Sequence, residues 1–252
     1  MSRRLEKFLG LAAVVAIAAA SALAGLAAAE TPVKIGSDGI EAEFEAGFSP
    51  KSLSKAEPTP ISLSLSGRVW AEGLEWVPPL KELLLEGDKH VDISVEGIPA
   101  CRWRQLQADT AGVRAACRKS LIGSGETQID IVFPSGPIPV KSELLAFNGG
   151  RRGGVTTLYL HAYITVPEPT VIVTKVKIKK VDEGRYGLRA RAMIPEIVGG
   201  SGSITSLDLR LRKRILSAIC PRDRRLRFKL EPRFDNGTRL DWTFVNFCKR
   251  RA

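Results

Sequence analysis

The sequence is poor in the residues that metal sites and nucleophilic sites need most. It has two histidines, His90 and His161, and no C-x-x-C motif, so we expect no zinc site and no other metal. The G-x-S-x-G motif of α/β-hydrolases is also missing, and turns explain the Gly-Ser-Gly tripeptides at 123–125 and 200–202. These absences argue against an enzyme, and no cofactor is expected.

Helical periodicity is rare as well, and strand patterns dominate the chain. One segment, Thr110 to Gly123, has the cap, the apolar pattern and the glycine stop that together predict a helix. Elsewhere short runs alternate between apolar and polar residues, most strictly from Ile61 to Ser66. The sequence therefore predicts a mainly β fold, an antiparallel β-sandwich or barrel with one short helix.

The first 29 residues have the pattern of a secretory signal peptide. A basic segment, MSRRLEK, precedes the apolar run Phe8 to Ala20, and an Ala-x-Ala site lies just before Glu30. We expect residues 1–29 to be removed and residues 30–252 to form a secreted or extracytoplasmic β-rich region. An uncleaved membrane anchor is the alternative, because the segment Leu9 to Ala29 is about as long as the roughly 20 apolar residues that span a bilayer.

Four cysteines lie in the region 30–252, at positions 101, 117, 220 and 248. An even number of cysteines in an exported chain predicts disulfides. Three connectivities can be drawn, and we favour Cys101 with Cys117 and Cys220 with Cys248, because each of these pairs closes a short local loop. The sequence leaves open whether this region builds one core or two sub-domains with a boundary near 148–156.

Positive charge is concentrated towards the C-terminus. The net charge is +11, and residues 210–252 contain fourteen Lys or Arg against four acids. A basic surface attracts anions and anionic polymers, although a solvated sheet face without a partner gives the same composition.

Eight basic residues are the candidates for anion binding. In a predicted hairpin that turns at Asn236-Gly237, the basic side chains share one face, opposite Phe228, Trp242 and Phe244. Three lysines share one face of another strand, and two arginines lie within the glycine-rich segment 149–154. This segment is either a mobile hairpin tip, which we favour, or a loop whose backbone N–H groups could also hold an anion. The candidates are Arg151, Arg152, Lys175, Lys177, Lys179, Arg225, Arg227 and Lys229.

Several long segments carry a resemblance to other sequences. They include EGIPACRWRQL, LLAFNGGRRGGVTTLYLHAYITVP and RYGLRARAMIPEIVGGSGSITSLDLRLRKR, and they run through most of the region after residue 30. In these segments the chain resembles a family of uncharacterised exported actinobacterial proteins. The resemblance implies export and a β-rich fold, and it implies no activity and no site.

These observations favour a non-enzymatic extracytoplasmic protein that binds an anionic envelope polymer or lipid surface. Nucleic acid is not expected, because the hairpin aromatics that could stack on bases face inward. One alternative is a hydrolase of envelope glycans or lipids, which would need a cleft that gathers Glu126, Asp130 or His161. The other is a carrier of a small apolar ligand inside the barrel. The sequence leaves the oligomeric state open.

Overall fold

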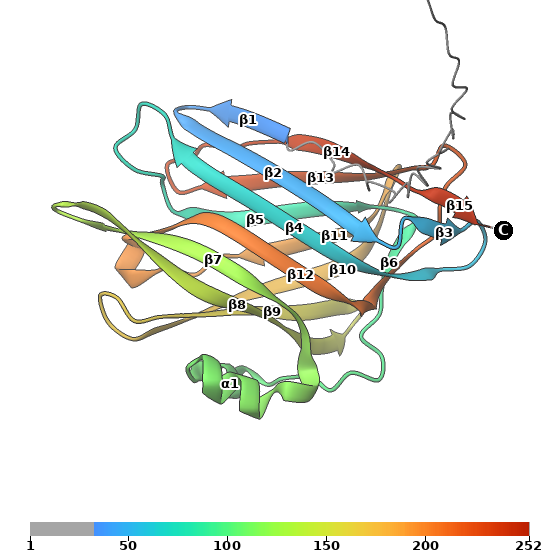
Figure 1. Ribbon diagram of the computed structural model, residues 1–252, viewed down its shortest axis with the longest axis horizontal. Helices are drawn as coiled ribbons and strands as arrows, with labels where there is room; N and C mark the ends of the chain where they lie inside the picture. The colour runs from blue at the N-terminus through green and yellow to red at the C-terminus, as the bar shows by residue number, and fades with distance from the viewer. Residues whose placement is uncertain (1–32, 252) are drawn as a thin grey trace, which may run out of the picture.

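The computed structural model describes residues 33–251, and most of its strands join one antiparallel sheet that curls into a nearly closed barrel (Figure 1). The predicted mainly β fold with one short helix is therefore confirmed. The signal peptide predicted for residues 1–29 lies outside the described residues. Within residues 33–251, no helix is both long enough and apolar enough to cross a membrane.

The strands vary from three to seventeen residues, and the longest ones form the barrel wall. They are β1 (Val33–Ser37), β2 (Ile40–Ser49), β3 (Ser52–Ser54), β4 (Thr59–Ala71), β5 (Leu80–Asp88), β6 (Val91–Ile93), β7 (Leu121–Phe133), β8 (Gly136–Arg152), β9 (Val155–Ile164), β10 (Thr170–Glu183), β11 (Tyr186–Met193), β12 (Gly202–Ala218), β13 (Arg225–Phe234), β14 (Trp242–Phe247) and β15 (Lys249–Arg251). The helical elements are η1 (Trp103–Gln107), α1 (Thr110–Ala116), η2 (Arg118–Ser120) and η3 (Val198–Gly200).

The strand order shows that the barrel joins distant parts of the sequence. Along the sheet the order is β1-β2-β4-β12-β7-β8-β9-β10-β11-β5-β13-β14, with β6 beside β12, while β3 and β15 form a separate parallel pair. The register from Leu145↔His161 to Arg152↔Val155 holds β8 and β9 together. Residues on both sides of the segment 148–156, considered above as a boundary, thus contribute to the same sheet.

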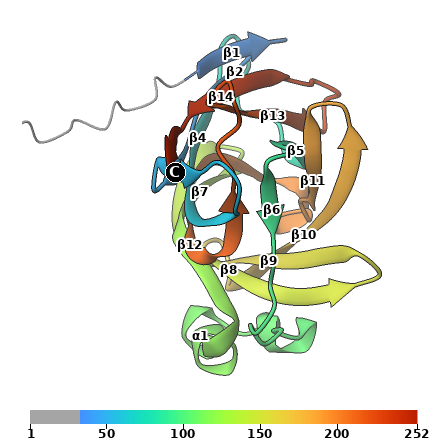
Figure 2. The same cartoon turned by 90° about the vertical axis from the view of Figure 1, so that its right-hand side faces the viewer.

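The barrel closes by side-chain packing where β14, at one edge of the main sheet, meets β2, the second strand from the other edge. Strand β14 lies against β2, and no backbone pairing between these two strands is present in the described part of the chain. Instead the rings of Phe44 and Trp242 pack with their centroids 4.5 Å apart. Figure 2 shows β1, β2 and β14 together on the side of the barrel opposite α1. We call this junction the seam.

Alternation along the strands puts apolar side chains inside the barrel. On β13, residues Leu226, Phe228 and Leu230 are buried, and the residues between them are more exposed, as the period of two predicts. A second apolar cluster lies outside the barrel wall, where Leu106 and Val113 of the helical segment cover Leu145, Phe147 and Tyr159 of β8 and β9. The helical segment therefore completes the burial of a face that would otherwise be exposed.

Two disulfides fix this segment and the C-terminus, as predicted. Cys101 is bonded to Cys117, and Cys220 is bonded to Cys248. The helix is shorter than expected, because α1 ends at Ala116 and β7 begins at Leu121. Its cap is Asp109 rather than Thr110, since the Asp109 carboxylate accepts a hydrogen bond from the backbone N–H of Gly112.

Strand β8 includes two prolines near its start. Strand β8 begins at Gly136 and pairs with β7 through Pro137 and Pro139. Pairing of β8 with β9 begins only at Leu145, so this part of β8 has a neighbour on one side alone. Proline lacks the N–H for a second ladder and is tolerated on such an edge.

We predict that the two disulfides stabilise the fold to a similar extent. Replacing Cys220 and Cys248 by alanine should lower the free energy of unfolding by about 3.5 kcal/mol, because their bond closes the longer loop. Replacing Cys101 and Cys117 should lower it by about 3 kcal/mol. Urea unfolding of both double variants checks these values, and a loss below about 1 kcal/mol would contradict the chain-entropy argument.

Candidate functional site

A row of cationic side chains runs along the outer face of β10. Lys175, Lys177 and Lys179 are exposed, whereas Ile172, Thr174 and Ile178 on the opposite face are buried. The ammonium of Lys175 lies 5.7 Å from the centre of the Trp103 ring, in η1. In residues 33–251, Lys177 and Lys179 have no ion pair and no side-chain hydrogen bond. Their charge is therefore uncompensated.

Arg152 extends this row onto the neighbouring hairpin. Arg152 pairs with Val155 on β9, and Val155 pairs with Lys179 on β10, so the two cations lie on the same outer face two strands apart. Adjacent strands are about 4.8 Å apart, which puts about 10 Å between the two backbones. We call Arg152, Lys175, Lys177 and Lys179 the cationic row.

Segment 149–154 forms the tip of the β8–β9 hairpin and not an open loop. Strand β8 continues to Arg152, and Gly153 and Gly154 form a tight turn with positive φ angles. The backbone N–H of Gly150 already donates to Oδ1 of Asn148. Arg151 pairs with Thr156, which is buried, and successive residues point to opposite faces, so Arg151 does not join the row.

The arginines on the next strand differ from the lysines because they have counter-ions. Arg189 of β11 contacts Glu86 of β5 at 2.6 Å and also pairs with Glu183, and Arg191 pairs with Glu82. Hydrogen bonding to Arg191 is the main cause that lowers the pKa of Glu82. Sequence analysis missed this network, since Glu82 and Glu86 lie more than 100 residues from their partners.

The predicted cationic face of the C-terminal hairpin is also compensated. Arg227 contacts Asp223 at 2.8 Å, and Lys229 contacts both Asp241 at 2.7 Å and Glu231 at 2.6 Å. Hydrogen bonds to Asp241 and Glu231 raise the pKa of Lys229. The guanidinium of Arg225 lies over the ring of Phe247, 5.9 Å from its centre. These three residues do face outward as expected, but two of them are already neutralised.

Charge is sorted between the two ends of the barrel. At one end the connections β1–β2, β4–β5, β7–β8, β9–β10, β11–β12 and β13–β14 contain a single basic residue, Arg239. The acidic residues there are Asp38, Glu72, Glu75, Glu168, Glu196, Asp235 and Asp241. At the opposite end the strand termini and connections carry Arg152, Lys179, Arg185, Arg222, Arg224 and the C-terminal Lys249, Arg250 and Arg251. The molecule is therefore electrically polar.

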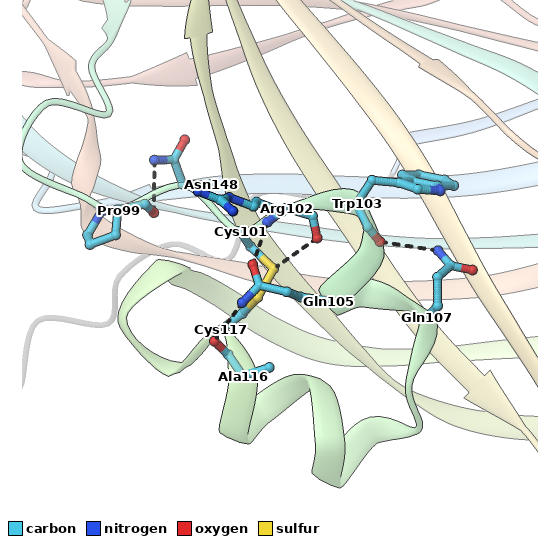
Figure 3. Close-up of a disulfide and its surroundings, with 9 residues drawn as sticks. All are labelled: Pro99, Cys101, Arg102, Trp103, Gln105, Gln107, Ala116, Cys117 and Asn148. Atoms are coloured by element: carbon cyan, nitrogen blue, oxygen red, sulfur yellow. Dashed lines mark hydrogen bonds between the residues drawn. A yellow bond between two sulfur atoms is a disulfide. The ribbon is translucent and has the colours of Figure 1, made fainter.

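His161 is enclosed beneath the disulfide-bonded segment. The buried Asn148 holds this segment by donating from Nδ2 to the carbonyls of Ile98 and Pro99. Figure 3 shows the bond to Pro99, and it shows Gln105 between the backbone N–H of Arg102, from which it accepts, and the carbonyl of Ala116, to which it donates. His161 is fully buried, and Nε2 lies 2.9 Å from the carbonyl oxygen of Ala108. Nδ1 has no partner among residues 33–251. Burial lowers the pKa of His161, so it is neutral near pH 7.

Two of the three residues named for a hydrolase share a groove, and His161 does not reach it. Glu126 and Asp130 lie on the outer face of β7 beside a polar groove, whereas His161 is fully buried under the helical segment. Asp130 accepts hydrogen bonds from Gln128 and Thr205, both at 3.0 Å. Glu126 is exposed opposite Asp208 of β12.

His90 is the second histidine, and it contacts Asp88 at 2.7 Å between Nδ1 and Oδ1. In the described part of the chain, no hydroxyl or thiol nucleophile hydrogen-bonds to this pair. All four cysteines are used by the two disulfides, so none offers a free thiol. No group of three or more His, Cys, Asp or Glu side chains within residues 33–251 is arranged to hold a metal ion.

Comparisons with protein-family models, with curated proteins and with solved structures find no match to this chain. The resemblance to exported actinobacterial proteins therefore stays a prediction. Any functional conclusion has to come from the geometry described above.

We predict that His161 makes the fold acid-sensitive. The pKa of His161 is lower in the folded protein than its ordinary value of about 6.5, so the unfolded chain binds the proton more readily. Stability should be greatest above about pH 6.5 and should fall as the pH drops below it, by up to about 1.4 kcal/mol per pH unit. Urea unfolding across this range measures the slope.

The variant His161→Phe should flatten this slope, whatever its stability at neutral pH, because it has no group to protonate. Ala115→Gln, at an exposed position of α1, is the control and should keep the wild-type slope. An unchanged slope in His161→Phe would assign the acid sensitivity to other groups.

Proposed function

We propose that this protein binds a linear anionic polymer outside the cytoplasm through the cationic row. The observation that carries the proposal is the contrast between neighbouring strands. Arg189 and Arg191 of β11 and Arg227 and Lys229 of the C-terminal hairpin have carboxylate partners, whereas Lys177, Lys179 and Arg152 have none within residues 33–251. Uncompensated cations on a rigid sheet retain their full attraction for an external anion.

The arrangement of the row favours a linear polymer over a flat lipid surface. Alternate residues of a strand are about 7 Å apart, so Lys175, Lys177 and Lys179 extend over about 13 Å of the barrel wall. A planar membrane would contact mainly the end of the barrel. A polymer that carries a phosphate or carboxylate on each repeat can follow the wall and meet several cations in turn.

The disulfides support a partner in an oxidising compartment. Both bonds are present, and bonds of this kind persist mainly outside the cytoplasm. Anionic polymers there include phosphate-bearing and acidic glycans of the cell envelope. The proposal places the protein in the envelope without requiring a catalytic step.

The test compares two triple variants of equal charge. Replacing Arg152, Lys177 and Lys179 by serine should reduce retention on purified cell-wall sacculi at low salt by at least tenfold. Replacing Arg225, Arg227 and Lys229 by serine removes the same charge but should reduce retention less than twofold, because two of these cations already have partners. Wild-type retention should also fall steeply as salt screens the row.

Equal losses in the two triple variants would contradict the proposal, since net charge alone would then govern binding. Retention on anionic liposomes but not on sacculi would make a lipid surface the partner. Thermal unfolding of both variants checks that neither loses binding through loss of the fold.

A further inference from the structure

The barrel holds an apolar cavity of about 90 Å³ on its axis. Every strand of the main sheet except β1, β6 and β14 contributes to its wall. The wall is formed mostly by apolar side chains, among them Phe44, Leu83, Ile129, Leu160, Ile172 and Phe234. Most of the lining residues lie in the halves of the strands nearer the acidic end of the barrel, and on β10 they face inward whereas the cationic row faces outward.

Two hydroxyl groups beside the cavity are already hydrogen-bonded, whereas the hydroxyl of the buried Thr174 has no hydrogen bond among residues 33–251. The Thr127 hydroxyl donates to the carbonyl of Ser206 at 2.8 Å, and the Thr205 hydroxyl donates to Asp130 at 3.0 Å. Pro232 in the wall has no backbone N–H to offer. A water molecule needs two to four polar partners, and cavities without them stay dry and accept apolar guests.

The seam lies beside this cavity. Phe44 belongs both to the cavity wall and to the aromatic pair with Trp242 that closes the barrel. Elsewhere around the main sheet, neighbouring strands are joined by backbone ladders, which are costly to open. Trp242 is buried, and its indole N–H has no acceptor among residues 33–251. The seam is therefore the place where the wall lacks a backbone ladder, and it also offers a hydrogen-bond donor without an acceptor among residues 33–251.

We propose that the cavity binds the end of an alkyl chain, which reaches it through the seam. A cavity of about 150 Å³ admits benzene, so this smaller space suits the terminal carbons of a chain rather than a whole lipid. The ring of Phe44 covers the access route. A polar group at the other end of the ligand would remain near Trp242, where the free N–H can donate to it.

Calorimetric titration with a series of n-alkanols, from butanol to decanol, tests the site. Affinity should rise about fourfold with each added methylene and then level off once the cavity is full. Adsorption to the outer surface would give no such plateau. The alkanols are uncharged, so the cationic row does not contribute, and this result is independent of the anionic polymer.

Filling the cavity from its wall should abolish the binding. Ala162→Leu and Ala192→Leu each add three carbons at wall positions, and each should weaken alkanol binding by at least tenfold. Ala115→Leu is the matched control on the exposed side of α1, and it should bind as the wild type does. Wild-type affinity in a folded filling variant would overturn the proposal.

A variant with an enlarged cavity provides a second test, which remains valid even if the two alanine-to-leucine variants fail to fold. Ile172→Ala removes wall carbons, so the plateau should move to a longer alkanol. Stopped-flow mixing then tests the route: Phe44→Leu should accelerate association, because the smaller side chain uncovers the seam. An unchanged association rate would place the access route elsewhere and overturn that part of the proposal.

Discussion

The contact between Phe44 and Trp242 closes the barrel, and the rest of the structure depends on it. The main sheet has two ends, β1 and β14, and backbone hydrogen bonds do not join β14 to β2. Apolar packing across the seam therefore holds the interior away from water, with Ile40, Leu230 and Leu240 around the aromatic pair. Hydrophobic packing is non-directional, so the wall is continuous there without being fixed by a ladder.

On the outer surface, some strands carry cations that are paired with carboxylates, and a neighbouring strand carries cations that are not. On β11 and β5, Arg189 with Glu86 and Arg191 with Glu82 form cross-strand pairs that satisfy one another. On β10 the lysines stand beside these pairs without a carboxylate of their own. Such pairs at a solvated surface contribute modestly to stability, and the neighbouring lysines keep a charge that can attract an anion.

Local patterns in the sequence predict local structure well here. Alternation on β13 gave its buried face, and short spacing favoured both disulfides, which the structure confirms. The counter-ions of Lys229 and Arg191 come from other parts of the chain, so no local pattern reveals them. The burial of His161 likewise depends on a segment more than fifty residues away, which covers β9. Which cations are free and which are neutralised therefore depends on the pairing of strands that lie far apart in the sequence.

The sorting of charge between the ends of the barrel also has a kinetic consequence. A body with acidic connections at one end and basic termini at the other has a large permanent dipole moment. In the field of an anionic surface it experiences a torque, and it turns before contact so that its basic end leads. Encounters would then begin from a restricted set of orientations, with the acidic end and its connections directed towards the medium.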